Sequence, residues 1–179
     1  MTKKLEEIIR VDHAGEFGAK VIYSGQIAAL RLKGDKETLH LVEEMKRQED
    51  VHYDYFDDLI KSQKVRPTVM QPVWRVGGFA LGFVTAMISK KAAMTCTVAV
   101  EEVIDQHYQE QLNDLKGVEG SDSKVPVDLR EKIIKFRDDE LEHRDIGYKH
   151  DAKGFGCFGV ASKVIKGMTR FAIGVSKRV

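Results

Sequence analysis

The strongest constraint on the fold is a Glu-x-x-His pair that lies on the apolar stripe of a predicted helix, and does so in two separate helices. A carboxylate and an imidazole three residues apart lie on one helix face, about one turn apart. In the helix predicted over residues 36–62, the stripe is Val42, Met45, Glu49, His52, Phe56 and Leu59. In the helix predicted to begin at 127 or 128, it is Leu129, Ile133, Phe136, Glu140, His143, Gly147 and His150. Both pairs therefore point into the expected core, where polar groups are costly without partners.

Two other predicted helices place single acids on their apolar stripes. The helix predicted from about residue 5 to residue 32 has the stripe Ile9, Asp12, Glu16, Ala19, Tyr23 and Ile27. The helix predicted over about 92–115 has the stripe Met94, Thr97, Glu101, Ile104, Tyr108 and Leu112. Glu102 differs from Glu101 by one residue of helix phase, and the stripe selects Glu101. Glu16 is therefore either an interface residue or a buried carboxylate with a partner.

The spacing of these residues indicates a diverged repeat of two helical hairpins, over residues 5–62 and 92–150. Four carboxylates and two imidazoles from four helices form the ligand set of a di-iron or di-manganese centre in a helical bundle. Hard oxygen donors with one imidazole per metal favour iron or manganese over copper or structural zinc. An accidental arrangement is disfavoured because each unpaired buried charge would cost several kcal/mol. The predicted metal ligands are Glu16, Glu49, His52, Glu101, Glu140 and His143.

Within this set we expect the two acids of the Glu-x-x-His pairs to bridge the metals, each histidine to bind one metal, and the other two acids to be terminal. Asp139 precedes Glu140 and could orient the imidazole of His52, as a carboxylate often does for a metal-bound histidine. The residue before the other pair is Gln48, which carries no charge, so the two metal sites would be inequivalent.

Tyr108 lies two turns after Glu101 on the same helix face, and His107 is beside it. The two residues could form a redox or proton relay near the metals. Alternatively, they are an aromatic core residue and its neighbour.

The acids and bases are separated along the chain. All 28 carboxylates lie in residues 1–58 and 101–151, whereas residues 59–100 and 152–179 contain basic residues and no acid. With 179 residues the chain is long enough for one domain with a sizeable core, and its net charge of +1 predicts no strong attraction to nucleic acid. The pattern therefore alternates acidic helical blocks with basic, apolar ones.

Both acid-free segments contain an apolar helix. Residues 76–89 carry no charge but are shorter than the ~20 residues needed to span a bilayer. They fit a buried crossover helix or one that lies in the membrane interface. The last predicted helix, 160–176, groups Val160, Val164, Met168, Phe171 and Val175 among basic residues. It is either a packing helix with a solvated basic face or an amphipathic helix on an anionic membrane, and the two segments together favour the membrane.

Other features exclude several classes of protein. Cys96 and Cys157 form no C-x-x-C motif and no disulfide framework, which suits a reducing compartment. The charged start of the chain contains no signal peptide, and we expect either a bacterial protein or a mature form. No Gly-rich dinucleotide fingerprint occurs, so a Rossmann-type NADH site is not expected.

The chain closely resembles the demethoxyubiquinone hydroxylases, di-iron monooxygenases of ubiquinone biosynthesis. The resemblance extends from about residue 8 to the C-terminus and is weakest in the loop predicted at 117–126. The segments that carry it are Arg10-Val11-Asp12-His13-Ala14-Gly15-Glu16, Cys96-Thr97-Val98-Ala99-Val100-Glu101-Glu102 with His107-Tyr108, and Asp139-Glu140-Leu141-Glu142-His143-Arg144-Asp145-Ile146-Gly147.

The resemblance implies an enzyme that uses O2 to hydroxylate a polyprenylated benzoquinone, with two Fe ions per chain and NADH or another reductant. It assigns His107 and Tyr108 to electron transfer between the quinone and the metals. It also implies a peripheral membrane protein, on the cytoplasmic face of a bacterial inner membrane or the matrix side of the mitochondrial one. A lipid-binding protein of the same pathway is an expected partner, and we expect a homo-oligomer.

We therefore predict one all-α domain over residues 1–179, a ferritin-like four-helix bundle around the metals. Two additional apolar and basic helices, within 72–91 and 158–179, are expected to face the membrane and form the quinone tunnel. One alternative is a ferritin-type ferroxidase or iron-storage protein, which would not need those two segments. Another is a non-catalytic quinone carrier, which would not need all six ligands.

Overall fold

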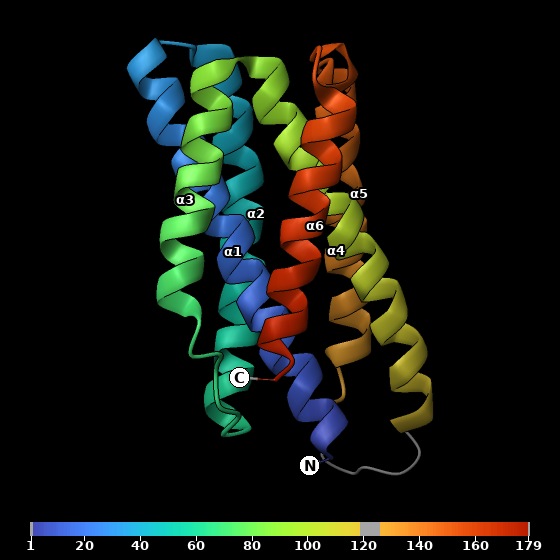
Figure 1. The fold of residues 1–179 in the computed structure, drawn as a ribbon. Coiled ribbons are helices and arrows are strands. Elements are labelled where there is room, and N and C mark those ends of the chain that lie inside the picture. Colours follow the sequence, from blue (N-terminus) through green and yellow to red (C-terminus); the bar gives the residue numbers. More distant parts are fainter. Residues whose placement is uncertain (1, 119–125, 179) are drawn as a thin grey trace.

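The computed structural model describes residues 2–118 and 126–178, which form helices and no strand (Figure 1). The helices are α1 (Lys3–Lys33), α2 (Lys36–Ser62), α3 (Gln71–Ile88), α4 (Lys90–Val118), α5 (Leu129–Lys149) and α6 (Phe158–Ser176), with a 3-10 turn at Ala152–Gly154. The predicted all-α class is confirmed, and the helix predicted over 36–62 coincides with α2. The predicted loop at 117–126 is partly wrong, because α4 continues through 118, and its residues 119–125 lie outside the described residues.

Four helices form a ferritin-like bundle, and the other two lie on one side of it. α1 packs against α2, and α4 packs against α5. α3 connects the two hairpins in sequence and lies along α1 on the outside of the first hairpin, so it is the long crossover connection of a ferritin-like bundle (Figure 1). α6 packs on α4, and both ends of the chain lie at the same end of the bundle (Figure 1).

Capping residues set the breaks between consecutive helices. Gly34 adopts the left-handed conformation, with φ 69°, and donates its backbone N–H to the last carbonyls of α1. The side chain of Asp35 accepts the backbone N–H of Thr38 at 3.1 Å and so caps α2. Between α3 and α4 only Ser89 intervenes, and its hydroxyl accepts the N–H of Ala92 at 3.0 Å. Gly34 and Asp35 therefore form the turn between α1 and α2.

The predicted apolar stripes of the bundle helices face the core. The stripe residues of α1, α2 and α4 are all buried, acids and histidines included. The stripe of α5 is buried as far as Gly147, whereas His150 is half-buried and follows the end of the helix. Helix periodicity therefore predicted correctly which side chains enter the core.

The apolar stripe of α6 faces outward, which contradicts the interpretation of α6 as a helix that packs through this stripe. α6 contacts the bundle through Ser162, Ile165 and Ser176, which are its buried residues. The residues of the stripe that are more than half exposed are Val160, Val164, Met168 and Phe171. Periodicity found the apolar face of α6 correctly, but the bundle covers the other face. Among the described residues, no helix combines the length and the apolar character needed to span a bilayer.

Glycines allow α3 to lie against the backbone of α1. A Cβ at Gly82 would collide with the carbonyl of Ile22, and a Cβ at Gly25 would collide with the carbonyl of Phe79. The two helices therefore cross where neither has a side chain. This close contact fixes the crossover helix against the bundle.

We expect Gly82→Ala to destabilise the protein by roughly 1–3 kcal/mol, because the added methyl group meets backbone atoms that cannot move aside. The matched control is Gly77→Ala on the same helix, where a Cβ meets no atom within 4 Å. The control should gain about 0.5–1 kcal/mol from improved helix propensity. Denaturant unfolding measures both, and equal stability of the two variants would contradict the close contact.

Candidate metal centre

Six acidic and imidazole side chains meet in the middle of the bundle. Glu16 comes from α1, Glu49 and His52 from α2, Glu101 from α4, and Glu140 and His143 from α5. Each of the six is at most 1% exposed. The structure therefore brings together every residue that the sequence predicted as a metal ligand.

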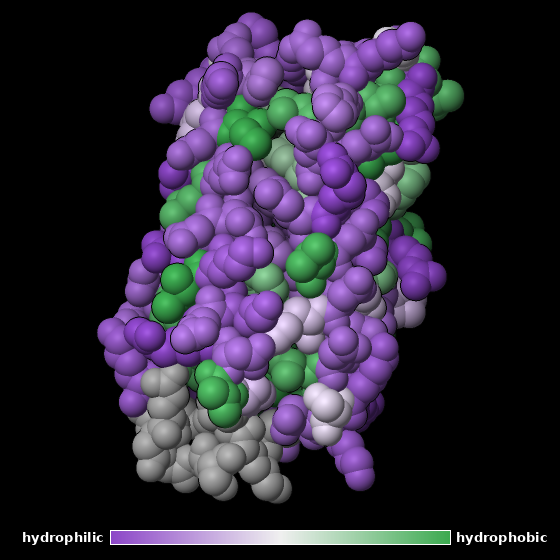
Figure 2. Space-filling model, turned by 180° about the vertical axis from the view of Figure 1, so that it is seen from behind, coloured by the Kyte–Doolittle hydropathy of each residue, from purple (hydrophilic) through white to green (hydrophobic). Residues whose placement is uncertain are grey.

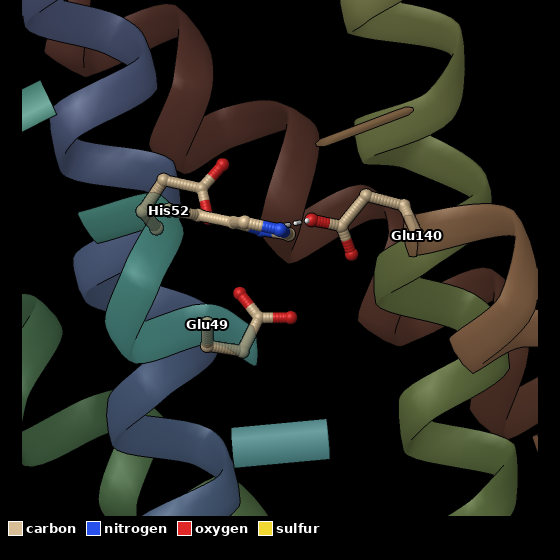
Figure 3. Close-up of side chains that lie close together, drawn as sticks. Glu49, His52 and Glu140 are labelled. Carbon is tan, nitrogen blue, oxygen red and sulfur yellow. Dashed lines mark ion pairs between the residues drawn. The ribbon is translucent and has the colours of Figure 1, made fainter. Parts of the chain in front are cut away.

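The six side chains form two groups of four that share two members. One group is Glu16, Glu49, His52 and Glu140, and the other is Glu49, Glu101, Glu140 and His143. Within each group, one potential ligand atom per residue lies within 4.8 Å of the others. Figure 3 shows Glu49, His52 and Glu140 pointing toward one another from α2 and α5. The shared residues are the two glutamates predicted to bridge the metals.

The atoms that face the centre lack hydrogen-bond partners. The Nδ1 atoms of His52 and His143 and both oxygens of Glu49 and Glu140 are buried without a hydrogen bond. His52 Nδ1 lies 3.2 Å from Glu140 Oε1, and His143 Nδ1 lies 3.1 Å from Glu49 Oε1, as ion pairs. Buried polar atoms are rarely left unpaired. These atoms are therefore arranged for a partner at the centre.

The outer nitrogens of the two imidazoles are held by different residues. His52 Nε2 lies 3.0 Å from Asp139 Oδ2, and His143 Nε2 lies 2.5 Å from Gln48 Oε1. The Asp139 contact was predicted from the sequence. Because each outer nitrogen contacts an oxygen, each Nδ1 is left as the atom that binds a metal. One imidazole faces a carboxylate and the other a neutral amide, so the two halves of the centre differ.

Two tyrosines hold Glu16 and Glu101, and each tyrosine binds the acid of the other helix. The Tyr23 hydroxyl on α1 donates to Glu101 Oε1 at 2.6 Å, and the Tyr108 hydroxyl on α4 donates to Glu16 Oε1. Each tyrosine follows the acid of its own helix by seven residues and binds the acid of the other helix. The sequence analysis missed Tyr23, although its equal spacing within the repeat was a usable signal.

Burial and neighbouring charges shift the titration of the centre. Burial disfavours charge on the imidazoles, but the adjacent carboxylates raise the pKa of His52 to about 12 and that of His143 to about 11. Burial and the charge of Glu140 raise the pKa of Glu49 to about 8 and that of Glu101 well above its usual range. Burial also opposes the charge of Glu140, but the two imidazoles hold its pKa below the usual range.

The donor set fits two divalent metal ions. Carboxylate oxygens with one imidazole per ion suit iron or manganese. Four carboxylates balance the charge of two such ions, which would replace the protons that the metal-free centre holds. Glu102 does not take part, because it accepts the Tyr148 hydroxyl at 2.6 Å and pairs with Lys166. The choice of Glu101 over its neighbour agrees with this geometry.

His107 lies outside the centre. Its Nε2 is 2.9 Å from Gln111 Nε2, and it lines a small cavity of about 20 Å³ near the end of the bundle. Of the two predicted relay residues, the structure therefore brings only Tyr108 into contact with a predicted ligand.

A large apolar groove lies beside the centre, between α3 and α6. Its volume is about 630 Å³, and α1 and α4 form its floor. Gly15 and Val100 line it and are the neighbours of Glu16 and Glu101 in sequence. Four glycines, Gly15, Gly18, Gly77 and Gly167, line the groove with open space where a Cβ would lie. The groove therefore owes much of its volume to missing side chains.

Comparison with known proteins matches nearly the whole chain. The family described as ubiquinone biosynthesis protein COQ7 matches residues 3–176. A mitochondrial NADPH-dependent 3-demethoxyubiquinone 3-hydroxylase of Dictyostelium discoideum is 49% identical over 98% of this chain and 77% of the relative. The human protein of the same name is 45% identical, over 98% and 78%. A 3-demethoxyubiquinol 3-hydroxylase of Rhodospirillum rubrum is 44% identical, over 98% and 78%.

Metal binding at neutral pH should release protons, because metal ligands must be deprotonated. The raised pKa values of His52 and His143, about 12 and 11, mean that both imidazoles are protonated before the metal binds. We expect at least about two protons released per chain, and an affinity that rises with pH between about pH 6 and pH 8. Calorimetric titration with Fe²⁺ or Mn²⁺ in buffers of different ionisation enthalpy measures the number of protons released per chain.

The variant His143→Gln should release about one proton fewer, because it removes one imidazolium. A binding heat that does not depend on the buffer, together with an affinity that does not depend on pH, would contradict the protonated metal-free centre.

Proposed function

The chain belongs to the COQ7 family of ubiquinone biosynthesis proteins, and from this we propose that it hydroxylates the ring of a polyprenylated demethoxyubiquinone, or of its reduced form, with O2 and a nicotinamide nucleotide as reductant. The observation that carries the proposal is that the buried polar centre and the apolar groove lie next to each other. A buried carboxylate and imidazole centre lies behind the floor of an apolar groove, and α1 and α4 contribute to both.

We propose that the six side chains of the centre hold two iron ions. Glu49 and Glu140 would be shared, each histidine would bind one ion, and Glu16 and Glu101 would be terminal ligands. When bound, the iron ions would supply the reduction of O2 beside the quinone ring. The hydroxyls of Tyr23 and Tyr108 would hold the terminal acids in place, since each donates to one of them.

The groove fits the ring and the first part of a prenyl chain. Its lining is almost entirely apolar, and a volume of 630 Å³ lies within the range of small-molecule sites. Ring binding near Gly15 and Val100 would place the reacting carbon next to the α1 and α4 segments that carry Glu16 and Glu101. The same apolar walls would exclude water from the reacting atoms.

The outer surfaces of α3 and α6 support attachment to a membrane. Both helices carry exposed apolar side chains, including Val76 at 71% and Val160 at 70% exposure. The opposite face is largely hydrophilic, with only scattered apolar residues (Figure 2). The segments 59–100 and 152–179 have no acid, so they would meet an anionic lipid surface without repulsion. A peripheral position would let a hydrophobic quinone pass from the bilayer into the groove.

The reductant is proposed from the names of the relatives. The mitochondrial relatives are named NADPH-dependent, whereas the name of the bacterial one specifies no reductant. We therefore propose a nicotinamide nucleotide, with NADH and NADPH to be compared directly. The rival storage function leaves the apolar groove unexplained, and the rival carrier function leaves the paired ligand groups unexplained.

The direct test is incubation of the iron-loaded protein with demethoxyubiquinone in vesicles, ¹⁸O2 and NADH or NADPH. Mass spectrometry should show one ¹⁸O atom in the product ring. Oxidation of iron without product would instead indicate a ferroxidase.

We expect Gly18→Leu to abolish this product while leaving iron content unchanged, because Gly18 lines the groove and its added Cβ would meet no atom within 4 Å, which leaves the rest of the side chain to occupy the groove. Helix stability should rise by about 0.5–1 kcal/mol through loss of the glycine. The matched control is Gly174→Leu, an exposed helical position outside the groove, which should keep full activity. Normal hydroxylation by the Gly18 variant would show that the groove is not the quinone site.

Membrane attachment is tested separately with vesicles that contain anionic lipid. The double variant Val164→Glu and Phe171→Glu should bind the vesicles at least about tenfold more weakly than the wild type, because it puts negative charge on the exposed stripe of α6. Val51→Glu, at an exposed position on α2, serves as the control and should bind normally. Equal co-sedimentation of both variants would exclude α6 as an attachment surface.

A further inference from the structure

The proposed reaction needs protons at a buried centre. Conversion of a ring C–H bond to C–OH, with the second oxygen atom released as water, consumes one O2, two electrons and two protons. A nicotinamide donor supplies a hydride, which is equivalent to two electrons and one proton. At least one further proton must therefore come from solvent in each turnover.

The apolar groove cannot supply this proton. Its lining contains no acid and no histidine. A route must therefore pass through polar side chains that connect the solvent with the centre from another direction.

Asp12 is the buried acid nearest to the centre that the centre does not use. It lies one helical turn before Glu16 on α1 and is 3% exposed. Its Oδ1 accepts a hydrogen bond from Gln111 Nε2 at 2.5 Å, and its Oδ2 has no partner. Burial, reinforced by the charge of Glu16, raises the pKa of Asp12 well above its usual range, although Gln111 partly opposes this. Asp12 is therefore more easily protonated than an ordinary aspartate.

His107 connects Asp12 with the surface. Its side chain is 11% exposed and lines the small cavity at the end of the bundle with Lys4 and Lys177. Its Nε2 lies 2.9 Å from Gln111 Nε2 and 3.9 Å from Asp12 Oδ1. Burial and the charges of Lys177 and Lys4 lower the pKa of His107 to about 4. The imidazole is therefore neutral, and can accept a proton at one nitrogen while it releases one from the other.

We propose that His107 and Asp12 form the proton entry route from solvent to the metal centre, with Gln111 as the amide that separates them. The proposal rests on the function proposed above, because it is the proposed reaction that consumes the proton. It assigns a role to Asp12 and Gln111, and it gives His107 proton transfer rather than electron transfer.

Gln111 Nε2 is a donor, so His107 Nε2 accepts its hydrogen bond and the neutral imidazole carries its proton on Nδ1. When the Gln111 amide turns away, His107 Nε2 takes a proton from water in the cavity and passes it to Asp12 Oδ1. As Oδ1 is protonated, Asp12 releases the proton on Oδ2 toward the centre on the side of Glu16. The imidazole is then neutral again, and rotation of the Asp12 carboxyl group returns its remaining proton to the Oδ2 position.

Several other groups face this route and set its electrostatic surroundings. Tyr108 and Tyr55 lie near enough for the charge of Asp12 to contribute to their raised pKa values, for which burial is the main cause. Asp114 lies near His107 and partly offsets the two lysines. The charged and titratable groups around the route are Lys4, Glu16, Tyr55, Tyr108, Asp114 and Lys177.

The test is the rate at which the Asp12 carboxyl proton exchanges with deuterium, measured by infrared spectroscopy on the iron-loaded protein. Among residues 2–118 and 126–178, Asp12 is the one buried aspartate. A protonated carboxyl band that shifts when the aspartates are labelled with ¹³C can therefore be assigned to Asp12 without mutation. We expect a protonated carboxyl band at neutral pH that Asp12→Asn removes. In His107→Gln the band should remain, but its shift in D2O should be slower by about tenfold or more.

The matched control is Asp57→Asn, which breaks another contact between an acid and a buried histidine, His13 Nε2 to Asp57 Oδ1 at 3.2 Å. It should change neither the band nor its exchange. Absence of a protonated aspartate band, or exchange at the same rate in His107→Gln, would overturn the route.

Turnover gives the second measurement. Asp12→Asn keeps the shape of the side chain and can still accept a hydrogen bond, so it should bind iron normally. Its hydroxylation should be slower and should show a larger solvent isotope effect than that of the wild type, because proton delivery to the centre then limits turnover. If the wild type hydroxylates no quinone, the proposed function fails, and the exchange experiment still decides whether the route exists. If hydroxylation occurs and exchange does not depend on His107, only the route fails.

Discussion

The repulsion among four carboxylates in one core is the interaction on which the rest of the structure depends. Burial removes the water that would otherwise screen these charges, so each must find a proton or a cation. Glu140 stays ionised because an imidazole lies on each side, whereas burial and its charge raise the pKa of Glu49 and Glu101. Without metal, the centre is thus a set of proton-loaded ligands, and two divalent ions can replace those protons. The tyrosines and the outer contacts to Asp139 and Gln48 hold the ligands in the positions that this exchange requires.

The bundle separates a polar side from an apolar one around this centre. On one side, α2 and α5 contact each other only slightly and leave a polar cleft of about 440 Å³, lined by Gln48 and Asp139. On the other side, α3 and α6 enclose the apolar groove and present exposed apolar residues. The two helices that complete the bundle core, α1 and α4, carry both the terminal acids and the groove floor. A hydrophobic molecule in the groove and the charged centre can therefore lie next to each other, the first in an apolar environment and the second in a polar one.

Much of the centre could be predicted from the sequence, because helix periodicity fixes which residues share a face. Glu16, Glu49, His52, Glu101, Glu140 and His143 were placed by their stripes, and all six are buried together. Periodicity cannot tell which face of a helix is covered, and for this reason the stripe of α6 was open to two interpretations. The hydrogen bonds that Tyr23 donates to Glu101 and Gln111 donates to Asp12 connect residues 78 and 99 positions apart. Such contacts depend on how helices pack, which stripes alone do not determine.

The central claim is that two iron ions occupy overlapping groups of ligands that share Glu49 and Glu140. Anomalous X-ray diffraction at the iron edge, on crystals of the reduced and iron-loaded protein, tests this claim most directly. The account predicts two iron peaks in the bundle core, one beside His52 and the other beside His143, with both shared glutamates between them. A single peak, or iron bound only at the protein surface, would contradict it.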